Sequence, residues 1–303
     1  MKDQADKLRQ AIDNQKLKQT VNQVIVPKPP VKRTARVITV TSGKGGVGKT
    51  NVSINLAIAL SEQGYRVIIL DADFGFANID VLFGIVPKYT LLDVVKNKKT
   101  ILEILTDGPM NTKFISGGSG VEDLVKLDKQ QIMKFVENMA LLDKNADIII
   151  VDTGAGLSEN VMSFILAADE VLLVTTPEPT SITDAYALIK MVSNRDKGKK
   201  IRVVVNRADS VNEANDVLNK LVMVAEKFLG ISLKPAGYIM HDDAVVRAVK
   251  KQQPFSISFP KSTAARNIRD ISEKLTEEEI AGDPAAYSGI RGFLNRLVGI
   301  MKA

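Results

Sequence analysis

Residues 43–50 read Gly-Lys-Gly-Gly-Val-Gly-Lys-Thr. This stretch matches the phosphate-binding pattern G-x-x-x-x-G-K-[ST], in which glycines let successive backbone N–H groups converge on phosphate oxygens at a helix N-terminus. An apolar run precedes it at 37–40, and a segment rich in Ile, Leu and Ala follows it at 51–63. The pattern therefore predicts a strand, a phosphate-binding loop and a helix.

The side chains of this loop have distinct expected roles. Lys49 places a positive charge near the β- and γ-phosphates of ATP, and the Thr50 hydroxyl is offered to Mg²⁺. A glycine turn with no ligand is the alternative, and a full match in the required context speaks against it. The expected nucleotide-binding residues of this segment are Gly43, Lys44, Gly45, Gly46, Val47, Gly48, Lys49, Thr50 and Asn51.

Further apolar, mostly β-branched runs predict strands at 67–70, 148–151, 171–174 and 201–205. They lack the alternation of a half-exposed strand, so we expect helices on both faces of the sheet. Because strands alternate with helical stretches, the expected class is α/β, with a doubly wound, mostly parallel sheet. The predicted division is an N-terminal helix (1–22), a proline-rich linker (23–35), an ATPase domain (36–281), and a linker with an amphipathic helix (282–303).

Composition limits the available chemistry. The chain has no Cys and a single His, which excludes disulfides and thiolate-bound clusters and disfavours transition-metal sites. Carboxylates, lysines, backbone groups and a hard ion remain. The net charge of +6 lies in the ends, because residues 1–36 hold nine basic and three acidic side chains. The core is not basic, so we expect no specific nucleic-acid partner.

Carboxylates follow two of the predicted strands. Asp71 and Asp73 come after the 67–70 strand, and Asp152 comes after the 148–151 strand. A carboxylate at such a position beside a phosphate-binding loop can orient a water molecule for in-line attack or reach Mg²⁺ through water. Two Asp residues at the end of a strand are more often an exposed cap of that strand. Because these two follow the phosphate-binding loop and its helix, we favour a role in hydrolysis or Mg²⁺ binding.

The loop and these carboxylate segments resemble the deviant Walker A family, the MinD/ParA-type ATPases. Residues 44–50 match the family pattern KGGxGKT, residues 71–80 resemble D-x-D-x-G-x-x-N-x-D, and residues 150–156 resemble its Walker B segment. The resemblance implies an ATP-bound homodimer in which Lys44 completes the partner's site. It assigns the attacking water to Asp73, which makes Lys44 and Asp73 the expected catalytic residues. The implied Mg²⁺ residues are Thr50, Asp71 and Asp152.

Two further segments resemble the adenine-binding parts of the family. Asn206 follows the 201–205 strand, and a turn Asn without a ligand is the alternative for it. Residues 237–245 resemble the adenine-side loop, with Met240 where the family usually has Pro, and Asp242 is the expected contact. The family also commonly has Pro where this chain has Gly154, so we expect a different geometry after Asp152.

The C-terminal stretch predicts an amphipathic helix with basic side chains on its polar face. Such a helix suits an anionic membrane surface, and it resembles the membrane-targeting helix of MinD-type proteins. The alternative is a terminal helix packed on the core, which has the same period. We expect the linker before it to uncouple it from the domain. The expected membrane-facing residues are Ile290, Phe293, Leu294, Leu297, Val298 and Met301.

No apolar run approaches the roughly 20 residues that span a bilayer, and the start lacks the apolar centre of a signal peptide. We therefore expect a cytoplasmic protein, peripheral at the inner face of the cell membrane.

Residues 3–9 read Asp-Gln-Ala-Asp-Lys-Leu-Arg and resemble the D-Q-A-x-x-L-R motif of the FlhG group (also YlxH or FleN), MinD-like regulators of flagellar number and placement. The implied partners are FlhF, a GTPase of the signal-recognition-particle type that the motif activates, and flagellar switch (C-ring) components. On a helix, we expect Asp3 to cap the N-terminus while Gln4 and Leu8 line one face and Arg9 projects beside it. The resemblance implies that Gln4 helps to order the attacking water of the partner and that Arg9 supports binding. The alternative is a disordered tail.

The expected function is an ATP-dependent, dimerising and membrane-associating switch that controls flagella and stimulates FlhF. Two alternatives stay open, a MinD-type division-site selector and a ParA-type partition ATPase. The basic N-terminal extension speaks against the first, and the core without a basic excess speaks against the second.

Overall fold

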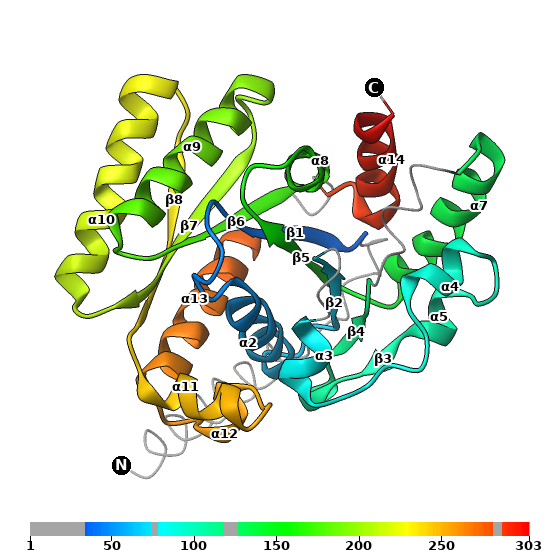
Figure 1. Cartoon of the computed structure of the whole chain (residues 1–303), viewed down its shortest axis with the longest axis horizontal. Helices are drawn as coiled ribbons and strands as arrows, with labels where there is room; N and C mark the ends of the chain where they lie inside the picture. Colours follow the sequence, from blue (N-terminus) through cyan, green and yellow to red (C-terminus); the bar gives the residue numbers. More distant parts are fainter. Residues whose placement is uncertain (1–33, 74–77, 118–126, 281–286, 303) are drawn as a thin grey trace, which may run out of the picture. The chain divides into compact units, whose positions relative to one another are not determined.

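The computed structural model describes residues 34–73, 78–117, 127–280 and 287–302. Within this part of the chain eight strands form one sheet in the order β3-β4-β2-β5-β1-β6-β7-β8 (Figure 1). All neighbouring strands are parallel except β3 and β4, which are antiparallel. The predicted class, a doubly wound and mostly parallel sheet, is therefore confirmed. The predicted helix at 1–22 lies outside the described residues.

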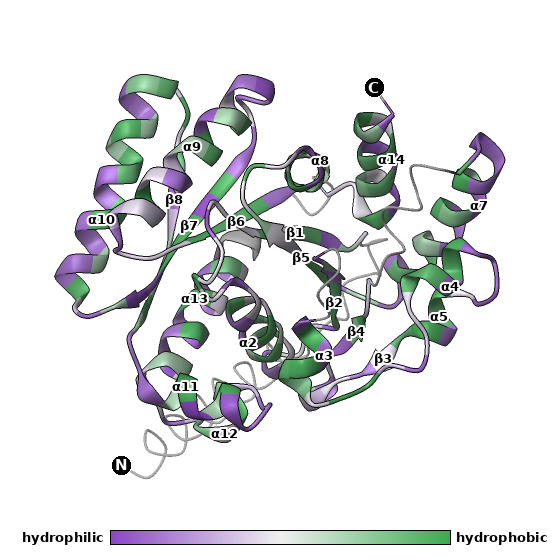
Figure 2. Ribbon diagram, in the orientation of Figure 1, coloured by the Kyte–Doolittle hydropathy of each residue, from purple (hydrophilic) through white to green (hydrophobic). Residues whose placement is uncertain are grey.

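The strands are β1 (Arg36–Ser42), β2 (Val67–Ala72), β3 (Thr106–Asp107), β4 (Lys113–Ile115), β5 (Ile148–Ala155), β6 (Glu170–Thr175), β7 (Lys200–Ala208) and β8 (Leu233–Met240). All residues of β1, β2 and β6 are buried, as the near-continuous apolar runs predict. Figure 2 shows the hydrophobic colouring concentrated in these strands and in the helix faces that meet them.

Helices cover both faces of the sheet. One face carries α2 (Lys49–Glu62), α3 (Asn78–Phe83), α11 (Asp243–Lys250), α12 (Phe255–Ser258) and α13 (Thr263–Ile280). The other carries α4 (Leu91–Val95), α5 (Ile101–Ile104), α7 (Lys129–Met139), α8 (Glu159–Ala167), α9 (Pro179–Arg195), α10 (Val211–Val224) and α14 (Gly289–Met301). Short helical turns are η1 (Pro109–Asn111), η2 (Ala140–Lys144) and η3 (Ala225–Leu229).

The two-sided packing explains the strand sequences. Ile38 and Val40 of β1 belong to the apolar cluster that includes α2 and α13, whereas Val37 of the same strand belongs to the cluster that includes α8 and α14. Because successive side chains of a strand point to opposite faces, a sheet covered on both faces needs apolar residues at every position. This arrangement brings the carboxyl ends of β1, β2 and β5 to one edge, where the loop at 43–48 also lies.

The C-terminal helix α14 packs on the domain. Ile290, Phe293, Leu294 and Leu297 are at most 2% exposed, and the Phe293 ring centroid is 6.1 Å from that of Phe164 in α8. The expectation that a linker uncouples this helix from the domain is wrong for this structure, because its apolar face completes the core and leaves only Val298 and Met301 of the expected membrane-facing set partly exposed. No helix in the described ranges is long and apolar enough to cross a membrane.

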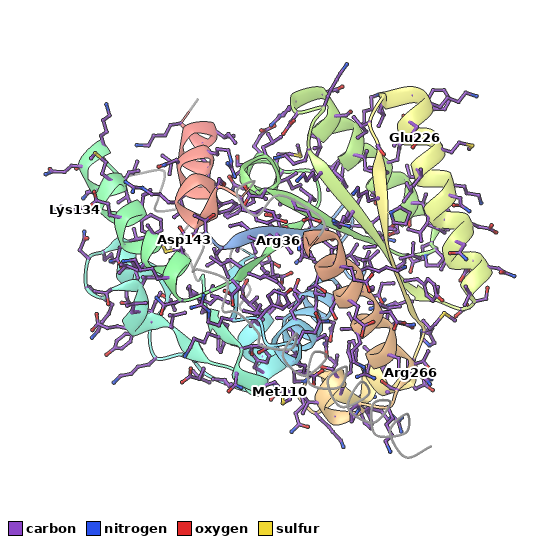
Figure 3. The ribbon with its side chains drawn as sticks, turned by 180° about the vertical axis from the view of Figure 1, so that it is seen from behind. Arg36, Met110, Lys134, Asp143, Glu226 and Arg266 are labelled. Atoms are coloured by element: carbon purple, nitrogen blue, oxygen red, sulfur yellow. The ribbon has the colours of Figure 1, made fainter. Side chains whose placement is uncertain are left out.

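Two carboxylates hold the start of α14. Asp143 Oδ1 accepts hydrogen bonds from the backbone N–H groups of Ile290 (2.9 Å) and Ala35 (3.2 Å). Asp169 Oδ1 accepts from the Ser288 hydroxyl at 2.7 Å and from the Arg296 guanidinium at 2.9 Å. In Figure 3, Asp143 lies at the base of α14. The helix is thus held by polar contacts as well as by its apolar face.

Candidate active site

The loop between β1 and α2 has the backbone that a phosphate-binding loop needs. Gly46 and Gly48 have φ of +79° and +91°, a region that side chains with a Cβ rarely adopt. Gly48 is the N-cap of α2 and provides no side-chain acceptor, so no side-chain cap occupies the helix N-terminus. Val47 is 4% exposed and anchors the loop in the core.

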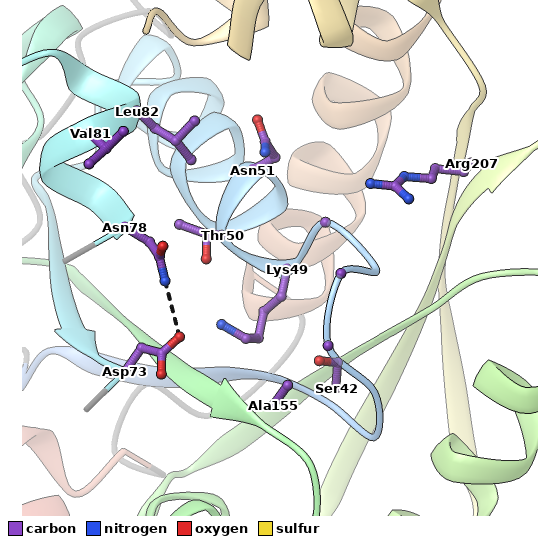
Figure 4. Close-up of a pocket in the computed structure, with 13 residues that line it drawn as sticks. Ser42, Lys49, Thr50, Asn51, Asp73, Asn78, Val81, Leu82, Ala155 and Arg207 are labelled. Carbon is purple, nitrogen blue, oxygen red and sulfur yellow. Dashed lines mark hydrogen bonds between the residues drawn. The ribbon is translucent and has the colours of Figure 1, made fainter. Parts of the chain in front are cut away.

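A cavity of about 390 Å³ opens above this loop. Lys49, Thr50 and Asp73 point toward the same space within it (Figure 4). A second cavity of about 490 Å³ shares Gly48 and Asn51 with the first. Together the two cavities bring most of the predicted nucleotide-binding residues to one place, whereas the predicted membrane residues line neither of them.

The floor of the site is a buried ion pair. Lys49 Nζ lies 3.1 Å from Oδ1 of Asp152, and the two side chains are 7% and 0% exposed. The Ser53 hydroxyl, one turn further along α2, donates to the same Asp152 oxygen at 2.7 Å. The other oxygen, Oδ2, is buried and has no partner among the described residues. A buried oxygen that accepts no hydrogen bond lowers the stability of the protein without ligand. The same oxygen can bind a cation directly or through a water molecule of the cation.

Asp71 and Asp73 lie at the end of β2 in different environments. Burial, followed by the negative charge of Asp152, raises the pKa of the Asp71 carboxyl to about 7. Asp73 lines the first cavity, and its Oδ2 accepts a hydrogen bond from the Asn78 amide at 3.1 Å. Burial also raises the pKa of Asp73, while the charge of Lys49 lowers it. Asp73 is therefore the carboxylate that reaches the cavity, and Asp71 lies behind it.

Lys44 lines neither cavity. Its Nζ lies 3.0 Å from Oε2 of Glu178 and 2.8 Å from Oγ1 of Thr180, both at the start of α9. The loop is pressed against this helix, because a Cβ on Gly43 would lie 2.4 Å from the Asp184 backbone. The lysine side chain is 38% exposed and so points to the surface beside the site.

Asn206 and Asp242, the two residues predicted to contact adenine, line the second cavity. Their side chains already form hydrogen bonds within the protein. The Asn206 amide donates to the Val47 carbonyl at 2.7 Å, which ties β7 to the loop. Asp242 caps α11 by accepting from the Ala244 N–H at 2.8 Å. The segment resembling an adenine-side loop is the end of β8, the start of α11 and the two residues between them.

A family model described as "ParA: NUBPL iron-transfer P-loop NTPase" matches residues 33–276. The chain belongs to the MinD/ParA family of P-loop ATPases. "Antiactivator FleN" of Pseudomonas aeruginosa is 42% identical over 264 residues, which cover 87% of this chain and 93% of FleN. "Flagellum site-determining protein YlxH" of Helicobacter pylori is 33% identical, with 88% of this chain and 91% of YlxH covered. The chain is thus a member of the FlhG group within the family.

A solved structure supports the same assignment for the fold. The septum site-determining protein MinD from Pyrococcus horikoshii, complexed with Mg-ADP, superposes with a TM-score of 0.64 at 26% identity, covering 82% of this chain and 98% of MinD. The residues of this ATPase fit such a ligand. Lys49 and the loop backbone suit phosphate oxygens, and the Thr50 hydroxyl with Asp152 Oδ2 provides the oxygen donors that Mg²⁺ prefers.

Sequence reasoning missed three residues of this site. Ser53 follows Lys49 by four positions on α2, a spacing that places both on one helix face and could have suggested it. Asn78 stands in the D-x-D-x-G-x-x-N-x-D segment, but the motif alone does not indicate its hydrogen bond to Asp73. Arg207, which lines both cavities with a φ of +59°, gives no such signal in the sequence.

Proposed function

We propose that this ATPase is a molecular switch that controls the number or placement of flagella by cycling between a monomer and an ATP-bound dimer. The observation that carries the proposal is the similarity to FleN and YlxH, proteins named as an antiactivator and as a flagellum site-determining protein, over 87% and 88% of the chain. The arrangement of Lys49, Asp152 and Asp73 around the loop supports ATP as the ligand that drives the switch.

Dimerisation would use Lys44. In the proposed dimer its ammonium group leaves Glu178 and reaches the phosphates held by the facing subunit. The Lys44–Glu178 pair is exposed (38% and 60%), and such surface pairs contribute about 0–1 kcal/mol. The exchange therefore costs little and gains a charged phosphate partner in a closed site.

Hydrolysis would use Asp73 to orient the attacking water. Thr50 and Asp152 would hold Mg²⁺, with Asp71 in its outer shell, and the bound ion would neutralise charge on the phosphates. Asp73 reaches the cavity while Asp152 is completely buried, and this difference supports the division of roles. Asn206 and Asp242 are proposed to contact the adenine side from the second cavity, after part of their present hydrogen bonding is exchanged.

Membrane association would require the release of α14. Fully burying a Leu, Ile or Phe side chain contributes about 1.5–3 kcal/mol, and four such side chains of α14 lie in the core. Release is therefore unfavourable unless an anionic bilayer receives the same face. A dimer that inserts two helices gains by avidity, which would make attachment depend on ATP.

The N-terminal motif is proposed to stimulate the GTPase FlhF. Asp3, Gln4, Leu8 and Arg9 lie outside the described residues, so the proposal rests on the motif alone. A segment this short is not a stable helix by itself and would fold on its partner. Flagellar switch (C-ring) components are the further proposed partners.

Flagellar counts test the proposal. A bacterial strain that carries Asp73→Ala or a deletion of the gene should have an altered number or position of flagella. Expression of the wild-type protein should restore the normal number and position. The GTPase rate of FlhF should rise with full-length protein and stay basal with Gln4→Ala. Normal flagella together with misplaced division septa would instead favour the MinD-type alternative.

A further inference from the structure

The end of β5 carries a feature that the ATP-binding pattern leaves unexplained. Gly154 follows Asp152 by two positions. The strand continues through Gly154 to Ala155, which pairs with Ser42 of β1. Gly154 is not among the glycines with positive φ, so its backbone conformation does not itself require glycine. The effect of a side chain at this position therefore depends on its neighbours.

The neighbour that limits this position is the carboxylate of Asp73. A Cβ built on Gly154 would lie 3.1 Å from Asp73 Oδ1 and 3.9 Å from its Cγ, with Val161 Cγ2 at 3.8 Å. The first distance is shorter than ordinary van der Waals contact, whereas the other two are normal. Any side chain at 154 would therefore press on one particular oxygen and move it by a few tenths of an ångström.

The opposite side of the same carboxylate is held by a hydrogen bond. The Asn78 amide donates to Asp73 Oδ2 at 3.1 Å (Figure 4), and the Asp73 backbone N–H donates to Asp71 Oδ1 at 3.1 Å. Asp73 is thus fixed through Oδ2 and its own backbone, while Oδ1 occupies the space that the missing side chain of Gly154 leaves open. Displacing Oδ1 would strain the Asn78 contact or turn the carboxylate away from the cavity.

We propose that Gly154 is a positioning residue for hydrolysis, because its lack of a side chain sets where the Asp73 carboxylate lies. The proposal rests on the proposed role of Asp73. Gly154 itself does not line either cavity, so a side chain there changes the orientation of the attacking water without removing a contact to the nucleotide. Rates of such reactions depend steeply on placement, since about 1 Å of misplacement can cost about a hundredfold.

The test compares Gly154→Ala and Gly154→Ser with wild type and with Asp73→Ala, measuring the dissociation constant for ATP, kcat for hydrolysis and the lifetime of the ATP dimer. We expect Gly154→Ala to lower kcat about tenfold and Gly154→Ser to lower it further. ATP affinity should stay within about twofold, and the dimer should last longer in proportion to the fall in kcat. Gly299→Ala, a glycine in α14 with open space around its Cβ position, is the matched control and should hydrolyse ATP like wild type.

Two results would overturn this inference without affecting the proposed function. One is a wild-type kcat in Gly154→Ala and Gly154→Ser while Asp73→Ala is slow, which would leave the role of Asp73 intact. The other is a parallel loss of ATP affinity and dimer, which would mean that position 154 shapes the binding site as a whole. If Asp73→Ala itself hydrolysed ATP at the wild-type rate, the proposed function of Asp73 would fail and this inference with it.

Discussion

Lys49 Nζ and Asp152 Oδ1 lie 3.1 Å apart in the floor of the site, with both side chains buried. Removing one member of a buried ion pair typically costs about 3–5 kcal/mol, because it leaves an uncompensated charge. The pair therefore holds the phosphate-binding lysine and the carboxylate of β5 in place before nucleotide arrives. Arrival of a phosphate gives Lys49 a second anion, and a cation would give Asp152 Oδ2 its missing partner.

Ser53→Ala should destabilise the nucleotide-free protein. It removes the donor to Asp152 at 2.7 Å and leaves a buried charged oxygen with less compensation, so the free energy of unfolding should fall by about 1–3 kcal/mol. Urea denaturation measures this. Ser61→Ala, on the same helix with its hydroxyl on the Met110 carbonyl, is the matched control and should cost less. An equal decrease in the free energy of unfolding of the two variants would show that the hydrogen bond from Ser53 to Asp152 stabilises the protein no more than an exposed one.

Asp71→Asn should change how stability depends on pH in the protein without nucleotide and Mg²⁺. Burial raises the pKa of this carboxyl in the folded state from its ordinary value of 3.8 to about 7, so between pH 4 and 7 the Asp71 carboxyl binds more protons in the folded than in the unfolded state. The contribution of Asp71 to wild-type stability therefore falls as pH rises through this window. The variant does not titrate there, so its stability relative to wild type should rise by on the order of 2–4 kcal/mol and level off above pH 7. If the difference in stability between Asp71→Asn and wild type does not change between pH 4 and 7, the pKa of Asp71 is not raised in the folded protein.

Lys44→Ala should bind ATP with near wild-type affinity and fail to form the ATP dimer. The side chain lines neither cavity of its own subunit, so the loss should appear only when two subunits meet. Fluorescent-nucleotide binding and light scattering measure the two properties. Glu178→Ala, which removes the present partner of Lys44, is the paired variant and should dimerise at least as readily as wild type. An ATP dimer of Lys44→Ala with normal stability would exclude the proposed exchange.

The sequence predicted the parts of the site that are encoded locally. The glycine loop, Lys49 and Asp152 follow from spacing and from neighbouring apolar runs, and the structure brings them together. Contacts between distant residues were not predictable in this way. Asn206 reaches the Val47 carbonyl from a residue 159 positions away, and nothing in the sequence near Asn206 indicates that partner. The short strands β3 and β4 were missed because two- or three-residue strands have no recognisable period. The edge strand β8 was also missed, because Pro235 and Gly237 interrupt its apolar pattern.

The position of α14 was also not predictable from the sequence. An apolar helix face has the same period whether it meets a bilayer or a protein core, so Phe293 and Leu297 could not distinguish the two. The deciding groups are Asp143 and Asp169, which come from other parts of the chain and bind the start of the helix. Their role depends on tertiary structure alone.

Asp169→Asn should favour the released state of α14. It removes the charge partner of Arg296 (2.9 Å), a contact of about 1 kcal/mol, so binding to anionic liposomes without ATP should rise about fivefold. Liposome co-sedimentation measures this. Asp107→Asn makes the same change in net charge at the exposed Lys113 pair, which joins β3 and β4, and serves as the control. If both variants bind liposomes equally, the gain comes from net charge and the docking contacts do not regulate the helix.

We propose that ATP, acting through this site, controls the association of two subunits. The most direct test is the mass of Asp73→Ala in solution, measured by size-exclusion chromatography with light scattering in Mg-ATP and in Mg-ADP. We expect a lasting dimer in Mg-ATP, because ATP binds but is not hydrolysed, and a monomer in Mg-ADP. The same mass in both nucleotides, with ATP bound, would contradict it.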